Sequence, residues 1–87
     1  MLDVRTAREF DAGHVPGAVH IPFWDARDPS TIIPAALTDP IVVYCGYGPR
    51  AWIAGAALRR RGYTQVSYLK GHMAMWTRAR LPEERRG

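Results

Sequence analysis

The 87-residue sequence predicts a single α/β domain with a mostly parallel sheet of about four strands flanked by helices. Two observations lead to this fold class. Short apolar runs rich in β-branched residues alternate along the chain with segments of helical composition, which is the pattern of a parallel sheet whose strands are joined by helices. In addition, a chain of this length has room for only one hydrophobic core.

The first half of the chain is predicted to contain short elements only. Residues 1–4 form a strand. Thr6 and Glu9 have the spacing of a capping box, so a helix should begin there and end near Gly13. The segments that follow, in order, are a strand at 18–21, a loop at 23–30 and a short helix at 32–37 with Pro34 in its first turn.

The second half carries the longest predicted helix. Residues 41–44 read as a buried strand, and the Ala- and Leu-rich segment 51–61 reads as a helix that Gly62 ends. A strand at 66–69 and a last helix opening at 71–76 follow. The helix residues expected to face the core are Trp52, Ile53, Ala56, Met73 and Trp76, with Ala54 and Gly55 allowing close helix-sheet packing.

The only cysteine, Cys45, lies at the junction between the strand 41–44 and the helix 51–61. In parallel sheets, ligands bind beyond the carboxyl ends of the strands. Gly46 and Gly48 allow the chain to curl so that successive backbone N–H groups point into one concavity, which would stabilise an anion at the sulfur. The amides expected to form this cradle are those of Gly46, Tyr47, Gly48, Arg50 and Ala51, since Pro49 has no N–H.

The order Cys-x-x-Gly-x-Arg after a hydrophobic strand resembles the active-site loop of the rhodanese family. Two more segments are similar to that family's first and last signature blocks, and they include Leu2-Asp3-Val4-Arg5, Gly13-His14-Val15-Pro16-Gly17-Ala18 and Lys70-Gly71-His72. The resemblance covers about residues 2–82, so we expect a rhodanese-like domain at 1–82 and a flexible tail at 83–87. The chain departs from the family at its front, where the usual first strand is absent.

The resemblance implies a sulfurtransferase of the rhodanese type, and the single cysteine leads us to expect it in the cytoplasm. Such an enzyme moves sulfane sulfur from a donor such as thiosulfate to cyanide or a thiol, through a persulfide on Cys45 and without another cofactor. The thiolate is its own nucleophile, so no histidine base is required. Arg50 has two open roles, which are binding an anionic donor and bracing the loop. The side chains expected to line the mouth are those of Phe23, Trp24, Arg27 and His72.

Three other functions compete with this one. A sulfur-relay or sensing module would receive persulfide from a partner protein, and a loop whose only charged side chain is Arg50 is compatible with that function. A phosphatase or arsenate reductase of the same fold has a loop one residue longer, whereas here four residues separate Cys45 from Arg50. A catalytically silent scaffold is disfavoured because Cys45 is present.

The composition argues against several classes of protein. The net charge is +4, but Arg59-Arg60-Arg61 ends a predicted helix, where cations complement the helix dipole, so nucleic-acid binding is not predicted. No apolar run approaches the roughly 20 residues of a membrane-spanning helix, and no secretory signal opens the sequence. A single cysteine forms no internal disulfide, which fits a reducing compartment.

The remaining expectations concern structure. Asp3 and Arg5 should form an internal ion pair, and His14 and His20 should be structural, so no metal site is predicted. Without the usual first strand, an edge or an apolar face of the sheet is left open. We therefore expect a homodimer or a segment supplied by a neighbour. The alternative is that the residues around Met1 and Leu81 cover that edge.

Overall fold

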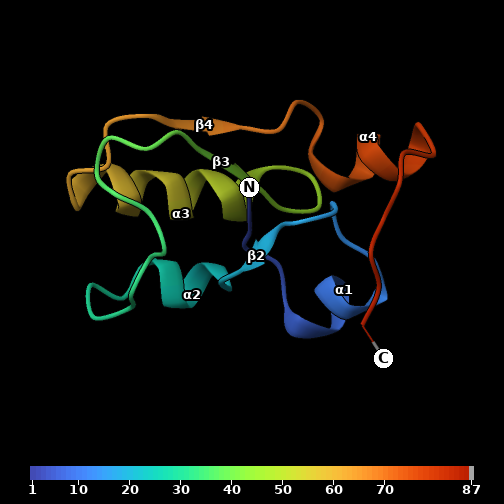
Figure 1. Cartoon of the computed structure of the whole chain (residues 1–87), viewed down its shortest axis with the longest axis horizontal. Coiled ribbons are helices and arrows are strands. Elements are labelled where there is room, and N and C mark those ends of the chain that lie inside the picture. The colour runs from blue at the N-terminus through green and yellow to red at the C-terminus, as the bar shows by residue number, and fades with distance from the viewer. Residues whose placement is uncertain (87) are drawn as a thin grey trace.

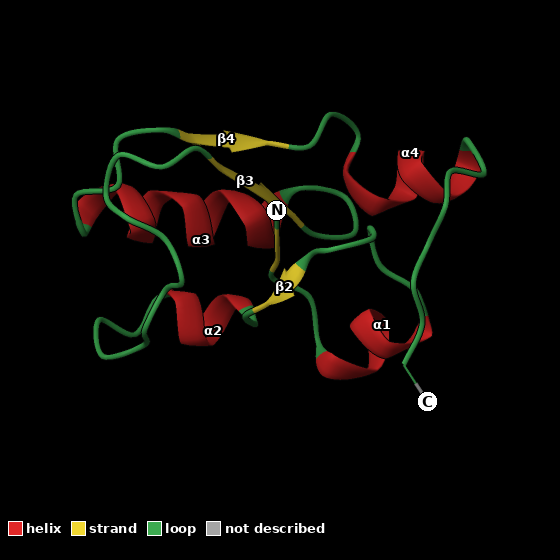
Figure 2. Ribbon diagram, viewed as in Figure 1, coloured by secondary structure: helices red, strands yellow, loops and turns green. Residues whose placement is uncertain are grey.

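The computed structural model describes residues 1–86 and confirms the α/β fold (Figure 1). Four strands form one parallel sheet in the order β2-β1-β3-β4. The strands are β1 (Leu2–Asp3), β2 (Val19–His20), β3 (Ile41–Tyr44) and β4 (Val66–Tyr68). The helices, which flank the strands in Figure 2, are α1 (Ala7–Ala12), α2 (Phe23–Ala26), α3 (Pro49–Arg60) and α4 (His72–Arg78).

Strand β3 contributes side chains to two hydrophobic clusters. Val43 belongs to the main cluster, which the strands form with α2 and α3, whereas the next residue, Tyr44, packs with Val15 and Met73 in a smaller cluster. This alternation means that β3 is buried on both faces, as is usual for a central strand of a parallel sheet. The register, with Leu2 opposite Val43, brings the carboxyl ends of β1 and β3 to the same edge.

Helix α3 packs its small residues against the sheet. Its buried residues are Ala51, Ala54, Gly55, Ala57 and Leu58. Trp52 and Ile53, which we expected in the core, are 57% and 43% exposed, and Ala56 is half-buried. That prediction was wrong because the buried face of α3 consists of other residues of the helix, and around Gly55 that face lies too close to the sheet for a large side chain. A Cβ on Gly55 would already collide with the ring of Tyr68.

The segment 23–30, predicted as a loop, contains the short helix α2. The N–H of Phe23 donates to the carbonyl of Val4 at 2.9 Å, and Ala26 is fully buried in the main cluster. Pro22 is the N-cap residue, and its φ of −54° and ψ of 150° give the extended backbone that is typical of an N-cap. These contacts with distant residues hold a helix that the local composition does not indicate.

The helix predicted at 32–37 is absent. The backbone turns there instead, and the carboxylate of Asp39 accepts a hydrogen bond from the Ala36 N–H at 2.8 Å. Pro34 lacks an N–H and disfavours the helical conformation in the residue before it. Ile33, that preceding residue, is buried in the main cluster and anchors the turn.

The other predicted elements are present with small shifts of their ends. The capping box of Thr6 and Glu9 opens α1. Helix α3 begins at Pro49, two residues earlier than predicted, because proline is well accommodated in a first helical turn. Gly62 follows the end of α3 with φ at 101°, a left-handed conformation that glycine adopts without strain. In α4, Met73 is buried and Trp76 half-buried, as expected for core residues.

The predicted ion pair of Asp3 and Arg5 is present and buried. One Arg5 nitrogen lies 2.8 Å from the Asp3 carboxylate and also donates to the carbonyl of Gly13 at 2.7 Å. His14 and His20 each place a ring nitrogen 2.7–2.8 Å from a backbone carbonyl. All four side chains therefore have structural partners near the carboxyl edge of the sheet.

The C-terminal segment packs against the domain within its described part. The backbone groups of Glu84 and His14 exchange two hydrogen bonds of 2.9 Å, and the Arg86 N–H donates to the Asp11 carbonyl at 2.9 Å. Within the expected flexible tail, 83–87, the described residues Glu84 and Arg86 thus contact His14 and α1, and the flexibility of the tail stays a prediction. Gly87 lies outside the described residues, and the domain boundary at 82 stays a prediction.

The sheet edges are the short strands β2 and β4, each paired on one side in the described part of the chain. The predicted association through an open edge stays a prediction. None of the helices described at 1–86 is long and apolar enough to cross a membrane.

Replacing Gly55 with alanine tests the close packing of α3. Helix propensity alone predicts that Gly55→Ala stabilises the domain by about 1 kcal/mol. Because the added Cβ would collide with the Tyr68 ring, we expect instead a net destabilisation of about 1–2 kcal/mol, measured by urea denaturation. In a Tyr68→Ala background, the same replacement should stabilise. An alanine variant more stable than its parent would show that the ring moves away freely.

Candidate active site

Cys45 follows β3 at the carboxyl edge of the sheet and opens the loop 45–48 that leads into α3. Its side chain is fully buried, and its Sγ accepts a hydrogen bond from the Gly48 N–H at 2.9 Å. The other amides of the predicted cradle, those of Gly46, Tyr47, Arg50 and Ala51, donate to no acceptor within residues 1–86. One amide thus contacts the sulfur, and four more in the same loop and helix turn are unpaired.

Gly48 turns the chain into α3 at a position that suits only glycine. Its φ is 136°, which residues with a side chain rarely adopt. A Cβ there would lie 3.2 Å from His72 Nε2 and 3.2 Å from Trp52 Cζ2. His72 and Trp52 therefore flank the loop. Sequence reasoning missed Trp52 as a site residue because its place depends on which face of α3 is buried.

The first turn of α4 fixes the loop 45–48 through its backbone. The Met73 N–H donates to the Cys45 carbonyl at 2.9 Å, and the Ala74 N–H donates to the Gly46 carbonyl at 3.0 Å. The first N–H groups of a helix have no partner inside the helix, and here they satisfy carbonyls of the loop. The loop carbonyls are thereby directed toward α4.

The His72 side chain contacts the backbone of the loop 45–48. It is buried, and its Nδ1 accepts a hydrogen bond from the Cys45 N–H at 3.2 Å. A ring nitrogen that accepts a hydrogen bond carries no proton, so the imidazole is neutral with its proton on Nε2. Burial lowers the pKa of His72 below its ordinary value of 6.5, which favours this neutral form.

Arg50 forms an ion pair with Glu9 of α1. Its two terminal nitrogens lie 2.6 and 3.1 Å from the two carboxylate oxygens, a bidentate geometry. The hydrogen bond from Arg50 lowers the pKa of Glu9 to about 2, helped by Thr6 of the capping box. A Cβ on Gly46 would lie 3.2 Å from an Arg50 nitrogen, so the guanidinium also borders the loop.

Three of the predicted mouth residues belong to α2 or its C-cap, namely Phe23, Trp24 and Arg27. Trp24 is half exposed and meets the ring of Phe23 edge-on, and Phe23 packs against the main cluster. Arg27 lines a groove on α3 together with Trp52. Among the residues at 1–86, no group of three His, Cys, Asp or Glu side chains is placed to hold a metal ion.

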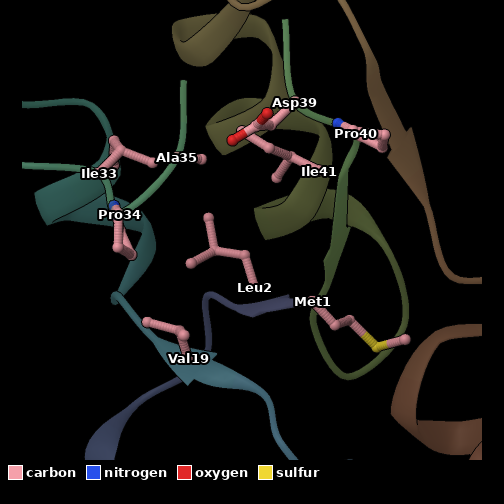
Figure 3. Close-up of a pocket in the computed structure, with 9 residues that line it drawn as sticks. All are labelled: Met1, Leu2, Val19, Ile33, Pro34, Ala35, Asp39, Pro40 and Ile41. Atoms are coloured by element: carbon pink, nitrogen blue, oxygen red, sulfur yellow. The ribbon is translucent and has the colours of Figure 1, made fainter. Parts of the chain in front are cut away.

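Two hollows lie at opposite ends of the strands. The one that borders the loop has a volume of ≈ 350 Å³ and is lined by Arg5, Gly46, Tyr47, Met73, Ala74 and Thr77. The other, of ≈ 340 Å³, is lined by residues that include Leu2, Val19 and Ile41 near the amino ends of the strands (Figure 3). Since the strands are parallel, only the first hollow is close to Cys45.

The sequence matches the family model of the rhodanese-like domain over residues 1–79. The thiosulfate sulfurtransferase GlpE of Pseudomonas savastanoi pv. phaseolicola is 34% identical over 97% of this chain and 76% of that protein. A sulfurtransferase of Allochromatium vinosum is 31% identical over 94% of this chain and 75% of that protein.

Solved structures have the same fold. A Rhodanese_3-like domain from Anabaena sp. superposes with a TM-score of 0.86 at 31% identity, covering 99% of this chain and 90% of that one. The human single-domain sulfurtransferase has a TM-score of 0.79 at 28% identity, covering 88% of this chain and 79% of that one. The residues matched by the family model, 1–79, include all four strands and the loop 45–48.

The neutral His72 predicts a loss of stability in mild acid. Since its pKa is lower in the folded chain than in the unfolded chain, the unfolded state binds more protons below about pH 6.5, and stability falls as the pH falls. Urea denaturation between pH 7.5 and 5 measures this slope, in a window above 4.5, the ordinary pKa at which Glu9 of the unfolded chain takes up a proton. The variant His72→Asn, whose amide oxygen accepts the same hydrogen bond and suits the left-handed φ of 53°, should show a smaller slope. An unchanged slope would contradict this role.

Proposed function

Because this chain belongs to the rhodanese-like domain family, we propose that it is a sulfurtransferase that carries sulfane sulfur as a persulfide on Cys45. The observation that carries the proposal is the hydrogen bond from the Gly48 N–H to the only thiol sulfur in the chain. An N–H donor stabilises a thiolate more than a thiol, because it meets a full negative charge.

The proposed cycle has two displacement steps. The Cys45 thiolate attacks the outer sulfur of a donor such as thiosulfate, a new S–S bond forms, and sulfite leaves with the electron pair of the old S–S bond. A thiolate or cyanide then attacks the outer sulfur of the persulfide, and the Cys45 thiolate leaves. No prosthetic group enters this cycle.

The unpaired amides of the loop are the proposed partners of the outer sulfur. In the persulfide, the negative charge moves one atom outward from Sγ. The N–H groups of Gly46, Tyr47, Arg50 and Ala51 have no other acceptor among the described residues, so they are available to that atom. Their dipoles act over short distances, which suits a charge on one buried sulfur.

The ion pair of Arg50 and Glu9 favours the sulfur-relay function as a second candidate. The guanidinium of Arg50, which borders the loop, is already paired with a bidentate carboxylate, so a small dianion must compete with Glu9 for it. A persulfide delivered by a partner protein brings less charge to the loop. Both candidates share the chemistry at Cys45 and fit a reducing compartment such as the cytoplasm.

A phosphatase of this fold is disfavoured by the loop. Four residues separate Cys45 from Arg50, and the Gly48 N–H already lies at Sγ, where a phosphate would require more room. The enclosed sulfur fits transfer of a single atom better than attack on a tetrahedral oxyanion.

The first experiment tests Cys45 as the sulfur carrier. After treatment with thiosulfate, intact mass should show one added sulfur atom on the parent protein and none on Cys45→Ser. Thiocyanate formation from thiosulfate and cyanide should be lost in the same variant, with circular dichroism unchanged. Near-parental thiocyanate formation by Cys45→Ser would rule out the persulfide route.

Replacing Glu9 with glutamine tests whether the ion pair restrains Arg50. Glutamine keeps the capping box of α1 but removes the charge, so Arg50 becomes available to thiosulfate. We expect KM for thiosulfate to fall about threefold in Glu9→Gln and to rise in Arg50→Gln, measured in steady-state assays. If Glu9→Gln leaves KM unchanged or raises it, the ion pair does not compete with the donor.

A further inference from the structure

A groove of ≈ 410 Å³ lies on the exposed side of α3. Helix α2 packs against α3 and runs beneath it in Figure 1. Its lining residues are Arg27, Trp52, Ile53, Ala56 and Arg60. From Trp52 to Arg60 the helix advances about 12 Å, at 1.5 Å per residue. An extended peptide of three or four residues covers that length.

The groove carries positive charge that the described part of the chain leaves uncompensated. Arg27 and Arg60 are exposed, and neither guanidinium has a hydrogen bond or ion pair within residues 1–86. The neighbouring arginines of α3 and its C-cap behave differently, because Arg59 donates to the Val66 carbonyl at 3.0 Å and Arg61 to the Thr31 carbonyl at 2.7 Å. No acidic side chain lines the groove.

Trp52 connects the groove to the catalytic loop. Its indole lies against Gly48, whose N–H donates to the Cys45 sulfur, and the backbone N–H of Trp52 donates to the Gly48 carbonyl at 3.0 Å. The groove therefore begins beside the loop and continues along α3 to Arg60. A ligand bound there has one end within reach of the loop.

The composition of the groove is that of a protein-binding surface. Exposed Trp52 and Ile53 offer apolar contact area, and tryptophan and arginine are enriched among the residues that dominate binding energy at interfaces. A small anion such as thiosulfate has no apolar surface to bury against Trp52 and Ile53. An acidic peptide segment with some apolar residues complements both parts.

We propose that this groove docks an acidic segment of the protein that exchanges sulfur with Cys45, an inference that rests on the proposed function. Carboxylates of the partner pair with Arg27 and Arg60, and its apolar side chains cover Trp52 and Ile53. The segment thereby presents the sulfur-bearing thiol of the partner at the loop 45–48. Recognition occurs on α3, and the chemistry occurs at Cys45.

The test uses two synthetic peptides as acceptors, each with one cysteine followed by four residues that are glutamate in one peptide and glutamine in the other. Cys45 is first loaded with sulfur from thiosulfate, and intact mass confirms the persulfide. Transfer to each peptide is then followed by mass spectrometry at low and high salt. We expect faster transfer to the acidic peptide, with a preference that the double variant Arg27→Gln, Arg60→Gln lowers about fivefold and that high salt also lowers.

The matched control is Arg78→Gln, which removes an exposed arginine of α4 that is not in the groove and should keep the preference. Equal transfer to both peptides by the parent protein would overturn the docking inference and leave the persulfide intact. A rise in KM for thiosulfate in the double variant, with no change in peptide preference, would assign the groove to the small donor and also overturn it. Failure of Cys45 to take up sulfur would instead overturn the proposed function.

Discussion

The attachment of the loop 45–48 to the first turn of α4 is the interaction on which the site depends. A loop with two glycines has many conformations, and only one set of them directs N–H groups toward the sulfur of Cys45. Two backbone amides of α4 hold the loop in such a conformation by donating to the carbonyls of Cys45 and Gly46, and the His72 ring accepts a hydrogen bond from the Cys45 N–H. Each bond contributes about 1 kcal/mol. In this arrangement the Gly48 N–H meets the sulfur, and the N–H groups of Gly46 and Tyr47 have no acceptor among residues 1–86.

Because of this attachment, residues of α4 that are distant in sequence help to determine the conformation of the loop 45–48. Met73 and Ala74 offer their N–H groups because they stand at a helix start, where no internal acceptor exists. His72 must be neutral to accept the Cys45 N–H, and its burial favours that state. The orientation of the backbone dipoles around the Cys45 sulfur is therefore determined partly by α4.

Local signals in the sequence predicted the parts of the fold that are held locally. The capping box of α1, the strand before Cys45 and the glycine after α3 all follow from neighbouring residues. Helix α2 was mispredicted because its start is held by the carbonyl of Val4, a residue distant in sequence. The turn at 32–37 was mispredicted because Pro34 disfavours a helix there.

Two site residues were missed for a related reason. Glu9 already had a local role in the capping box, and its second partner, Arg50, lies 41 residues away. Trp52 was assigned to the core because it is large and apolar. The collision that a Cβ on Gly55 would have with Tyr68 shows why small residues occupy that face. The packing that forms the main core thereby places an aromatic side chain beside Cys45.

The unpaired arginines on α3 lie apart from the backbone amides at the Cys45 sulfur. At the loop, Arg50 is paired with Glu9, so the net charge offered to an approaching anion is small. On α3, Arg27 and Arg60 are unpaired within the described residues, and Arg60 lies about 12 Å from Trp52 along the helix. At physiological ionic strength the screening length is about 8 Å, so Arg60 acts weakly on an ion at Cys45. A partner long enough to contact both places gains from the charges of the groove, whereas a single small ion at the loop gains mainly from the backbone amides.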